Sequence, residues 1–511
     1  MSRMENTFKN AKYSLLSQFT SLILTFVSKT VFLKVLGAAY SGVSGLYGNI
    51  LGVLSLAEMG VSSAMAFALY KPTADNDIEK LKSLMYVYKR VYRIIAIIIA
   101  VLGLCLSPFL KYIINGGEII GYEKLTIYYY LFLFDTVSSY FVSYKYSIVY
   151  AEQKGYICTN INLIWTIINV TIKTIVLLMT KSYLAYLSIG IVINLLQKIY
   201  MNVFINKKYE YLQDTNCEKL SKEETASIKK NVKALIFHNI GGKMVNQTDN
   251  IIISAFINIT VAGYVSFYTM VMNAANSVIN TILSAAVSSI GNVVAKESME
   301  KQKAVIDKYV FINSYVSGFA CAGFFLLLSP FVELMWGKEL LIPDTVIFFL
   351  VFSVYISYQL NCINNIKSAA GIFDEDKYIP LLQSIINLVV SVALAKKIGL
   401  AGVYIGTVAQ GAVALICKVL ITYKCMFNTG IIEYAKGQLL YLILVTVSSI
   451  ICMPIKNMIF VNGVSILSFA IMFIVVCAIT NIILLIGLWH KKETKFYIDL
   501  FKGMVKKYMH I

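Results

Sequence analysis

The residues most able to bind ions or charged ligands gather within residues 234–257, a run that is otherwise apolar. They are one histidine, one lysine, one aspartate and three asparagines: His238, Asn239, Lys243, Asn246, Asp249 and Asn250. At 100° per residue they share one arc of about 140° on a helix. A run of about 20 apolar residues can cross a bilayer, where an ionisable group facing lipid costs about 2.5–3.5 kcal/mol. This polar face must therefore contact other helices or a water-filled cavity.

Further candidate residues lie in other apolar runs. Gln18 and Lys29 share one polar arc of about 120° with several serines on residues 12–33. The remaining candidates occupy separate runs: Glu58, Asp135, Lys173, Asn273 and Asn280. Serine, glycine and asparagine stripes of this kind fit close helix packing as well as a cavity lining, and for residues 42–68 both interpretations stay open.

The composition indicates what kind of protein positions these residues. The chain has 511 residues, of which 58% are hydrophobic and 14% charged, with a mean hydropathy of +0.72. A soluble domain has about 25% charged residues. The sequence therefore predicts an all-α polytopic membrane protein with about fourteen transmembrane helices. The nine cysteines show neither CxxC nor Cys/His spacing, so no disulfide framework, metal site or catalytic centre is expected.

The expected spans alternate with basic loops. They are 12–33, 42–68, 92–113, 127–149, 158–180, 184–205, 234–257, 263–290, 310–332, 345–366, 378–396, 400–421, 437–455 and 463–489. With the N-terminus inside, 34 of the 45 lysines and arginines fall in cytoplasmic segments and eight in outside loops. The positive-inside rule then predicts a cell-membrane protein with both termini in the cytoplasm. The net charge of +18 reflects this topology, so nucleic acid is not an expected partner.

The chain also contains an internal repeat. The matching segments are 38–40 with 262–264, 107–110 with 329–332, 154–157 with 376–379, and 184–190 with 400–406, at offsets of 224, 222, 222 and 216. Six spans therefore recur as parallel halves. The expected domains are an N-terminal lobe (1–205), a cytoplasmic linker (206–233), a second lobe (234–421), and two added helices with a basic tail (422–511). Two such lobes form an alternating-access transporter that holds its substrate between them.

These features resemble a known superfamily. The chain resembles the multidrug/oligosaccharidyl-lipid/polysaccharide (MOP) superfamily in three features: fourteen spans, a six-plus-six repeat with two extra helices, and an aspartate on a polar seventh span. Residues 246–254 (NQTDNIIIS) and 56–61 (LAEMGV) resemble its bacterial polysaccharide-unit flippases, which serve O-antigen, capsule or exopolysaccharide assembly. The resemblance implies a flippase that moves an undecaprenyl-pyrophosphate-linked oligosaccharide from the inner to the outer leaflet. It implies no enzyme activity and no cofactor, and its expected partners are membrane lipids, a polysaccharide polymerase and glycosyltransferases.

That activity assigns roles to the polar residues. A pyrophosphate needs cations and hydrogen-bond donors, and Lys243, near the middle of its span, is the first expected contact. Lys29 and Lys173 lie nearer the outer ends of theirs, where snorkelling to lipid headgroups is an open alternative. The sugar is expected to bind the amide side chains of Gln18, Asn239, Asn246, Asn250, Asn273 and Asn280.

The three intramembrane acids, Glu58, Asp135 and Asp249, leave two interpretations open. They bind the coupling ion, a proton or Na⁺, or they are structural, either as ion pairs with intramembrane lysines or as groups that burial keeps neutral. His238, close to the cytoplasmic end of its span, is expected to line the cavity rather than relay protons.

Three other functions are alternatives to this flippase activity. A multidrug exporter would favour acids over lysines in its cavity, whereas here three lysines accompany three acids. The lipid II flippases share the fold but have an arginine-rich cavity, whereas here Arg3 and Arg90 lie outside the spans and Arg93 lies at the very start of span 92–113. A membrane polymerase or ligase generally carries catalytic residues on a long outer loop, but the longest such loop here, residues 109–125, has neither histidine nor arginine.

Overall fold

The computed structural model describes residues 3–214, 220–221, 223–224, 226, 228, 247–284, 286–372 and 374–509. Throughout these residues the regular structure is helical, without a strand. Ten of the described helices are long and apolar enough to cross a membrane. The predicted class, an all-α polytopic membrane protein, is therefore confirmed, while the number fourteen stays a prediction.

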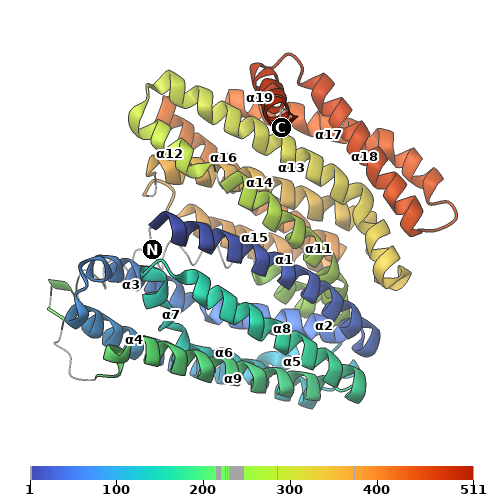
Figure 1. The fold of residues 1–511 in the computed structure, drawn as a ribbon. Helices are drawn as coiled ribbons and strands as arrows, with labels where there is room; N and C mark the ends of the chain where they lie inside the picture. Colours follow the sequence, from blue (N-terminus) through green and yellow to red (C-terminus); the bar gives the residue numbers. More distant parts are fainter. Residues whose placement is uncertain are drawn as a thin grey trace. The chain divides into compact units, whose positions relative to one another are not determined.

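The chain divides into two compact units, Met1–Ser266 and Phe267–Ile511. The helices of the first are α1 (Arg3–Leu36), α2 (Ala38–Leu54), α3 (Leu56–Asp75), α4 (Ile78–Leu106), η1 (Ser107–Phe109), α5 (Leu110–Ile113), η2 (Gly117–Ile119), α6 (Tyr122–Ser143), α7 (Tyr146–Ala151), α8 (Gly155–Thr180), α9 (Tyr183–Lys208) and η3 (Glu210–Gln213), followed by helical residues 247–256 and the start of α11 (Ile259–Ser284) (Figure 1). Within this unit α8 packs against both α1 and α9, and α6 packs against α4 and α9.

Four predicted spans are not single helices, which corrects the expectation for 42–68, 92–113, 127–149 and 263–290. The first breaks at Ser55 between α2 and α3, the second passes from α4 through η1 to α5, the third breaks between α6 and α7, and the fourth between α11 and α12 (Val287–Lys296). At Ser55 the backbone amide and the side-chain hydroxyl both donate to the Leu51 carbonyl, at 2.9 and 2.8 Å. Serine hydroxyls that bond backbone carbonyls in this way commonly bend helices, and hydropathy does not register the effect.

Buried tyrosines form much of the core of the first unit. Tyr47, Tyr88 and Tyr129 are almost fully buried. The Tyr47 hydroxyl donates to the Leu125 carbonyl at 2.7 Å, and the Tyr129 hydroxyl donates to the Gly103 carbonyl at 3.0 Å. Each ring thus buries its apolar body while its hydroxyl keeps a partner, as a dry interior requires.

Two glycines allow a close helix crossing in the same unit. A Cβ atom on Gly42 of α2 would lie 2.0 Å from the Ile259 carbonyl oxygen, and one on Gly263 would lie 2.0 Å from the Ala38 carbonyl oxygen. No larger residue fits at either position without separating the backbones. Small residues at membrane helix crossings permit this kind of approach.

The second unit continues from α11 with long helices. They are α12, α13 (Met299–Trp336), η4 (Lys338–Leu340), α14 (Asp344–Ala370), α15 (Ile379–Ile398), α16 (Leu400–Phe427), α17 (Ile432–Ile459), α18 (Ile466–Gly487) and α19 (Lys492–Met509). Helix α16 packs closely on α14 and α15, while α13 packs on α14, α17 and α18.

A buried polar network attaches α17 to its neighbours in this unit. Gln438 of α17 donates to the Ser314 hydroxyl on α13 at 2.9 Å and accepts from the Tyr355 hydroxyl on α14 at 2.8 Å. Ser314 donates in turn to Gln359 on α14 at 3.3 Å. The first of the two added helices is therefore fixed by specific hydrogen bonds as well as by apolar contact.

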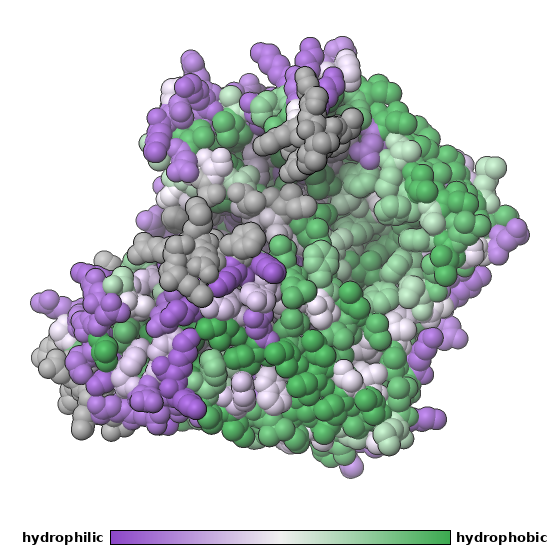
Figure 2. Space-filling view, in the orientation of Figure 1, coloured by the Kyte–Doolittle hydropathy of each residue, from purple (hydrophilic) through white to green (hydrophobic). Residues whose placement is uncertain are grey.

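The surface of the helices suits a lipid environment. Figure 2 shows apolar side chains over the flanks of the helices, and hydrophilic side chains gathered near the ends of α3 and α4. On α18, Ile466, Ile474 and Ile486 are all largely exposed. Such apolar flanks are stable in hydrocarbon but costly in water.

Candidate functional site

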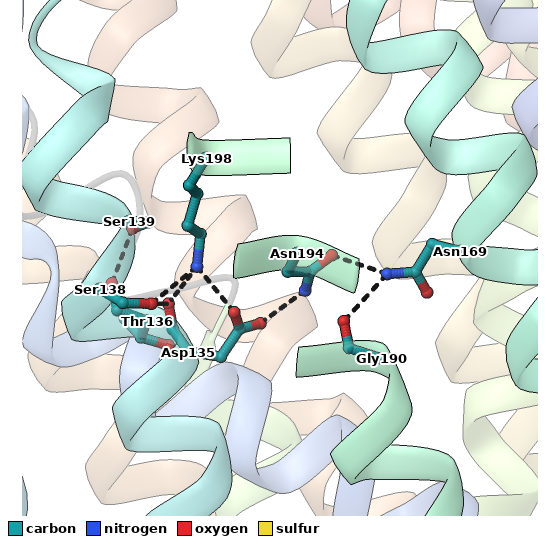
Figure 3. A network of polar contacts seen from close by, with 8 residues as sticks. All are labelled: Asp135, Thr136, Ser138, Ser139, Asn169, Gly190, Asn194 and Lys198. Carbon is teal, nitrogen blue, oxygen red and sulfur yellow. Dashed lines mark hydrogen bonds and ion pairs between the residues drawn. The ribbon is translucent and has the colours of Figure 1, made fainter. Parts of the chain in front are cut away.

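A lysine and an aspartate form an ion pair inside the first unit. Lys198 Nζ on α9 lies 2.7 Å from Asp135 Oδ1 on α6. The same ammonium group donates to the Asp135 carbonyl and to the Ser138 hydroxyl, both at 2.8 Å (Figure 3). The side chains of Asp135 and Lys198 are 30% and 16% exposed, so the pair is mostly, not wholly, shielded from solvent.

An amide chain extends this pair across the unit. Asn194 Nδ2 donates to Asp135 Oδ2 at 2.8 Å, and Asn169 Nδ2 on α8 donates to Asn194 Oδ1 at 2.7 Å. Figure 3 shows these side chains meeting from three helices, α6, α8 and α9. Both carboxylate oxygens of Asp135 are engaged, so a proton or cation that binds there must displace Lys198 or Asn194. Conversely, an anion that binds the Lys198 ammonium group would compete with Asp135 for it and would break the ion pair.

The ion pair lies well inside its helices. Lys198 precedes the end of α9 at Lys208 by a distance of about 15 Å along the axis. Lys198 is a further charged residue within a predicted span, 184–205, and it was not among the candidates. Its partner favours the second interpretation of Asp135, an ion pair with a lysine in the membrane. Asn194, four residues before Lys198 on the same face of α9, is the signal that could have indicated a polar site there.

The second repeat has no charges at the corresponding positions. With offsets of 222 and 216, Asp135 corresponds to Ser357 and Lys198 to Ala414. The helices that carry these two residues, α14 and α16, still pack closely. The helix pair therefore folds without the ion pair. Since a shielded ion pair seldom stabilises a fold more than apolar residues of the same size, its presence in the first repeat favours a functional role.

Lys29 and Lys173 lie on α1 and α8 of the same unit. Lys29 Nζ donates to the Ser41 hydroxyl of α2 at 2.9 Å, and Ser41 bonds the Ser266 hydroxyl at 2.9 Å. Lys173 Nζ lies 4.1 Å from the centroid of the Tyr186 ring. Both ammonium groups thus contact polar or aromatic groups of neighbouring helices, whereas the snorkelling alternative places them in the headgroup layer.

The structure also describes four other sequence-predicted residues of this unit, Glu58, Asp249, Asn250 and Gln18. Glu58 on α3 accepts a hydrogen bond from the Tyr92 hydroxyl at 2.9 Å. Asp249 and Asn250 lie half-buried on helical residues 247–256, and Gln18 lies half-buried on α1. In that helix Gln247 contacts Gly52 of α2, where a Cβ atom would lie 3.1 Å from the amide. The structure thus brings Asp135 together with Lys198, a residue that was not among the candidates, rather than with Glu58.

The remaining candidates divide into two groups. On α11, in the second unit, Asn273 is exposed and Asn280 is half-buried. Between them Asn276, which was not among the candidates, accepts a hydrogen bond from the Tyr358 hydroxyl. Four candidates lie outside the described residues: His238, Asn239, Lys243 and Asn246.

Comparison with known proteins identifies the fold. No protein-family model matches the sequence, and no curated protein matches it. Among solved structures, the lipid II flippase MurJ in an inward closed conformation matches with a TM-score of 0.65 and 14% identity, covering 96% of this chain and 100% of that one. An inward-facing multidrug-resistance MATE transporter of the MOP superfamily matches with a TM-score of 0.61 and 14% identity, covering 80% and 98%. The chain has the fold of the MOP-superfamily transporters.

A third solved structure bears on the substrate, which this fold does not determine. A MOP-superfamily transporter from Pyrococcus furiosus, described by the reverse polarity of its binding pocket and a suggested different function, matches with a TM-score of 0.53 and 15% identity. The match covers 83% of this chain and 96% of that one. The MOP fold therefore gives the architecture, and the substrate has to be argued from the side chains.

Proposed function

We propose that this protein is an alternating-access flippase for an undecaprenyl-pyrophosphate-linked oligosaccharide used in cell-surface polysaccharide assembly. Its work is translocation from the inner to the outer leaflet, with no bond made or broken, and so it is not an enzyme. Protons or Na⁺ are the proposed coupling ions, and Lys243 is the proposed pyrophosphate contact.

The observation that carries this proposal is the extent of the structural match to a lipid flippase. The unmatched 4% of 511 residues is about 20, so the MurJ alignment includes most of residues 422–511, which carry α17, α18 and α19. The inward-facing MATE structure leaves 20% of this chain unmatched, about 100 residues. The alignment with the lipid flippase therefore covers more of this chain than the alignment with that multidrug transporter.

The charges within the first unit support an anionic substrate. Lys29, Lys173 and Lys198 all lie on helices that can cross the membrane. Lys29 donates to the Ser41 hydroxyl, Lys173 lies over the Tyr186 ring, and Lys198 pairs with Asp135. A pyrophosphate headgroup is stabilised by ammonium groups in a shielded site, whereas a cationic drug would be repelled by them.

Two alternatives from the same superfamily remain distinct proposals. A lipid II flippase would carry the same lipid pyrophosphate with a different sugar, and the match to MurJ supports it equally. A multidrug exporter is supported by the MATE matches alone. A polymerase or ligase would need catalytic side chains, and the described polar site consists of one ion pair and amides.

Deletion of the gene in its host tests the proposal. We expect lipid-linked repeat units to accumulate facing the cytoplasm while surface polysaccharide falls, because glycosyltransferases continue to make units that cannot cross. The measurement is the quantity of lipid-linked units accessible to a glycosidase in inside-out and right-side-out vesicles. Unchanged surface polymer with new drug sensitivity would indicate an exporter, and accumulation of lipid II would indicate the peptidoglycan precursor as substrate.

A further inference from the structure

Both repeats bury a lysine at the same position near the cytoplasmic ends of their helices. Lys145 lies between α6 and α7 in the first unit, and Lys367 lies in the last turn of α14 in the second. The repeat offset of 222 relates them. The residues are 8% and 4% exposed. A buried ammonium group is unstable unless anions or dipoles replace its lost water.

The second unit supplies an anion to its lysine. Lys367 forms an ion pair with Asp376, a residue that is 3% exposed. Lys418 on α16 also faces Asp376, with its ammonium 3.7 Å from Oδ2, and donates to the Asn364 amide oxygen at 2.9 Å. This cluster is therefore two lysines around one carboxylate.

The first unit supplies no carboxylate to Lys145 among its described residues. Lys145 Nζ donates to the amide oxygens of Asn202 and Asn206 on α9, both at 2.5 Å. Asn202 corresponds to Lys418 at the offset of 216, and Lys154 corresponds to Asp376 at the offset of 222. Lys89 adds a second positive charge that acts on Lys145.

We propose that Lys145 binds a phosphate-class anion, which supplies the counter-charge that Asp376 supplies in the second repeat. The anion comes from an anionic lipid headgroup or from free phosphate on the cytoplasmic side. Asn202 lies one turn along α9 from Lys198, and the proposed site does not depend on which lipid the protein transports.

The chemistry of the surroundings favours phosphate over a simpler anion. Two of the three ammonium protons of Lys145 are held by amides, which leaves one donor, and Lys89 adds positive charge to the site. A phosphate-class anion offers several acceptor oxygens to the remaining donor, whereas chloride is a single acceptor. The basic loops place this end of the unit in the cytoplasm, where anionic headgroups concentrate.

The test uses the full-length protein in a neutral detergent and measures its unfolding temperature. One series adds sodium phosphate against sodium chloride at matched ionic strength, and a second adds short-chain phosphatidylglycerol against phosphatidylcholine. The decisive variant is Asn202→Asp, which places a carboxylate against Lys145 without changing the size of the side chain. Lys145→Gln removes the cation, and Lys367→Gln is the matched control in the second unit.

We expect phosphate, phosphatidylglycerol or both to raise the unfolding temperature of the wild-type protein. The apparent affinity should fall about tenfold or more in Asn202→Asp and in Lys145→Gln, the size of effect that a lost charged hydrogen bond produces. Lys367→Gln should be less stable but keep the response. A response to phosphatidylglycerol alone identifies a headgroup as the source, and a response to phosphate identifies the free anion. An equal response to chloride, or an undiminished response in Asn202→Asp, overturns the proposal.

Discussion

At the scale of single residues, the Asp135–Lys198 pair is the feature that packing does not explain. The pair has good geometry and a full set of hydrogen bonds, which suits a structural role. However, the second repeat achieves the same helix packing with Ser357 and Ala414. A charged pair that the fold does not need, set among amides within the membrane, is what an ion- or headgroup-sensitive step requires.

Copying the second repeat into the first tests this reasoning. Asp135→Ser or Lys198→Ala alone should destabilise the protein by about 1–3 kcal/mol, because each leaves the partner charge uncompensated and the pair is only partly shielded. The double variant should recover most of that stability and still fail to transport. Unfolding temperature and transport are measured on the same preparations. Transport at the wild-type rate by the double variant would mean that the pair is only structural.

At the scale of elements, close backbone approach fixes the crossing of α2 with the start of α11. Both Gly42 and Gly263 contact backbone atoms of the other helix, so the crossing tolerates no side chain. Backbone atoms cannot rotate away as a flexible side chain can. This crossing is therefore the most substitution-sensitive helix contact described in the first unit.

Gly42→Ala should lower the unfolding free energy by about 1–3 kcal/mol, the usual cost of overpacking. Gly45→Ala in the same helix is the matched control, because nothing lies within 4 Å of a Cβ atom there. The measurement is membrane abundance and unfolding temperature of the two variants. If both variants behave alike, the close approach does not limit stability.

The elements also show how far the sequence can be interpreted. Hydropathy located the long helices, such as α8 and α18, because one lipid-facing flank and length suffice to define them. It missed the break at Ser55, which depends on a hydroxyl bonding its own backbone. It also missed Lys198 as the partner of Asp135, because 63 residues separate them in the sequence and only folding brings α6 against α9. The sequence identified Asp135 as an unusual residue, but not what it contacts.

At the scale of the whole molecule, charge distribution predicts orientation. The loops predicted to lie on the cytoplasmic side carry many lysines, and the tail helix α19 carries five in its eighteen residues. We expect a reporter fused after residue 511 to be active only in its cytoplasmic form, and a cysteine placed near residue 338 to react with a membrane-impermeant reagent from outside. The reverse pattern would invert the topology and with it the assignment of cytoplasmic ends.

The central claim is that the protein moves a lipid-linked anion between leaflets. The most direct measurement is translocation of a purified undecaprenyl-pyrophosphate-linked oligosaccharide in proteoliposomes, read as the fraction of sugar accessible to an external glycosidase over time. We expect the wild-type protein to make the lipid-linked sugar of the inner leaflet accessible to the glycosidase. The Asp135→Ser/Lys198→Ala variant should leave that sugar protected. Proteoliposomes that transport a cationic dye but leave the inner-leaflet sugar protected would contradict it.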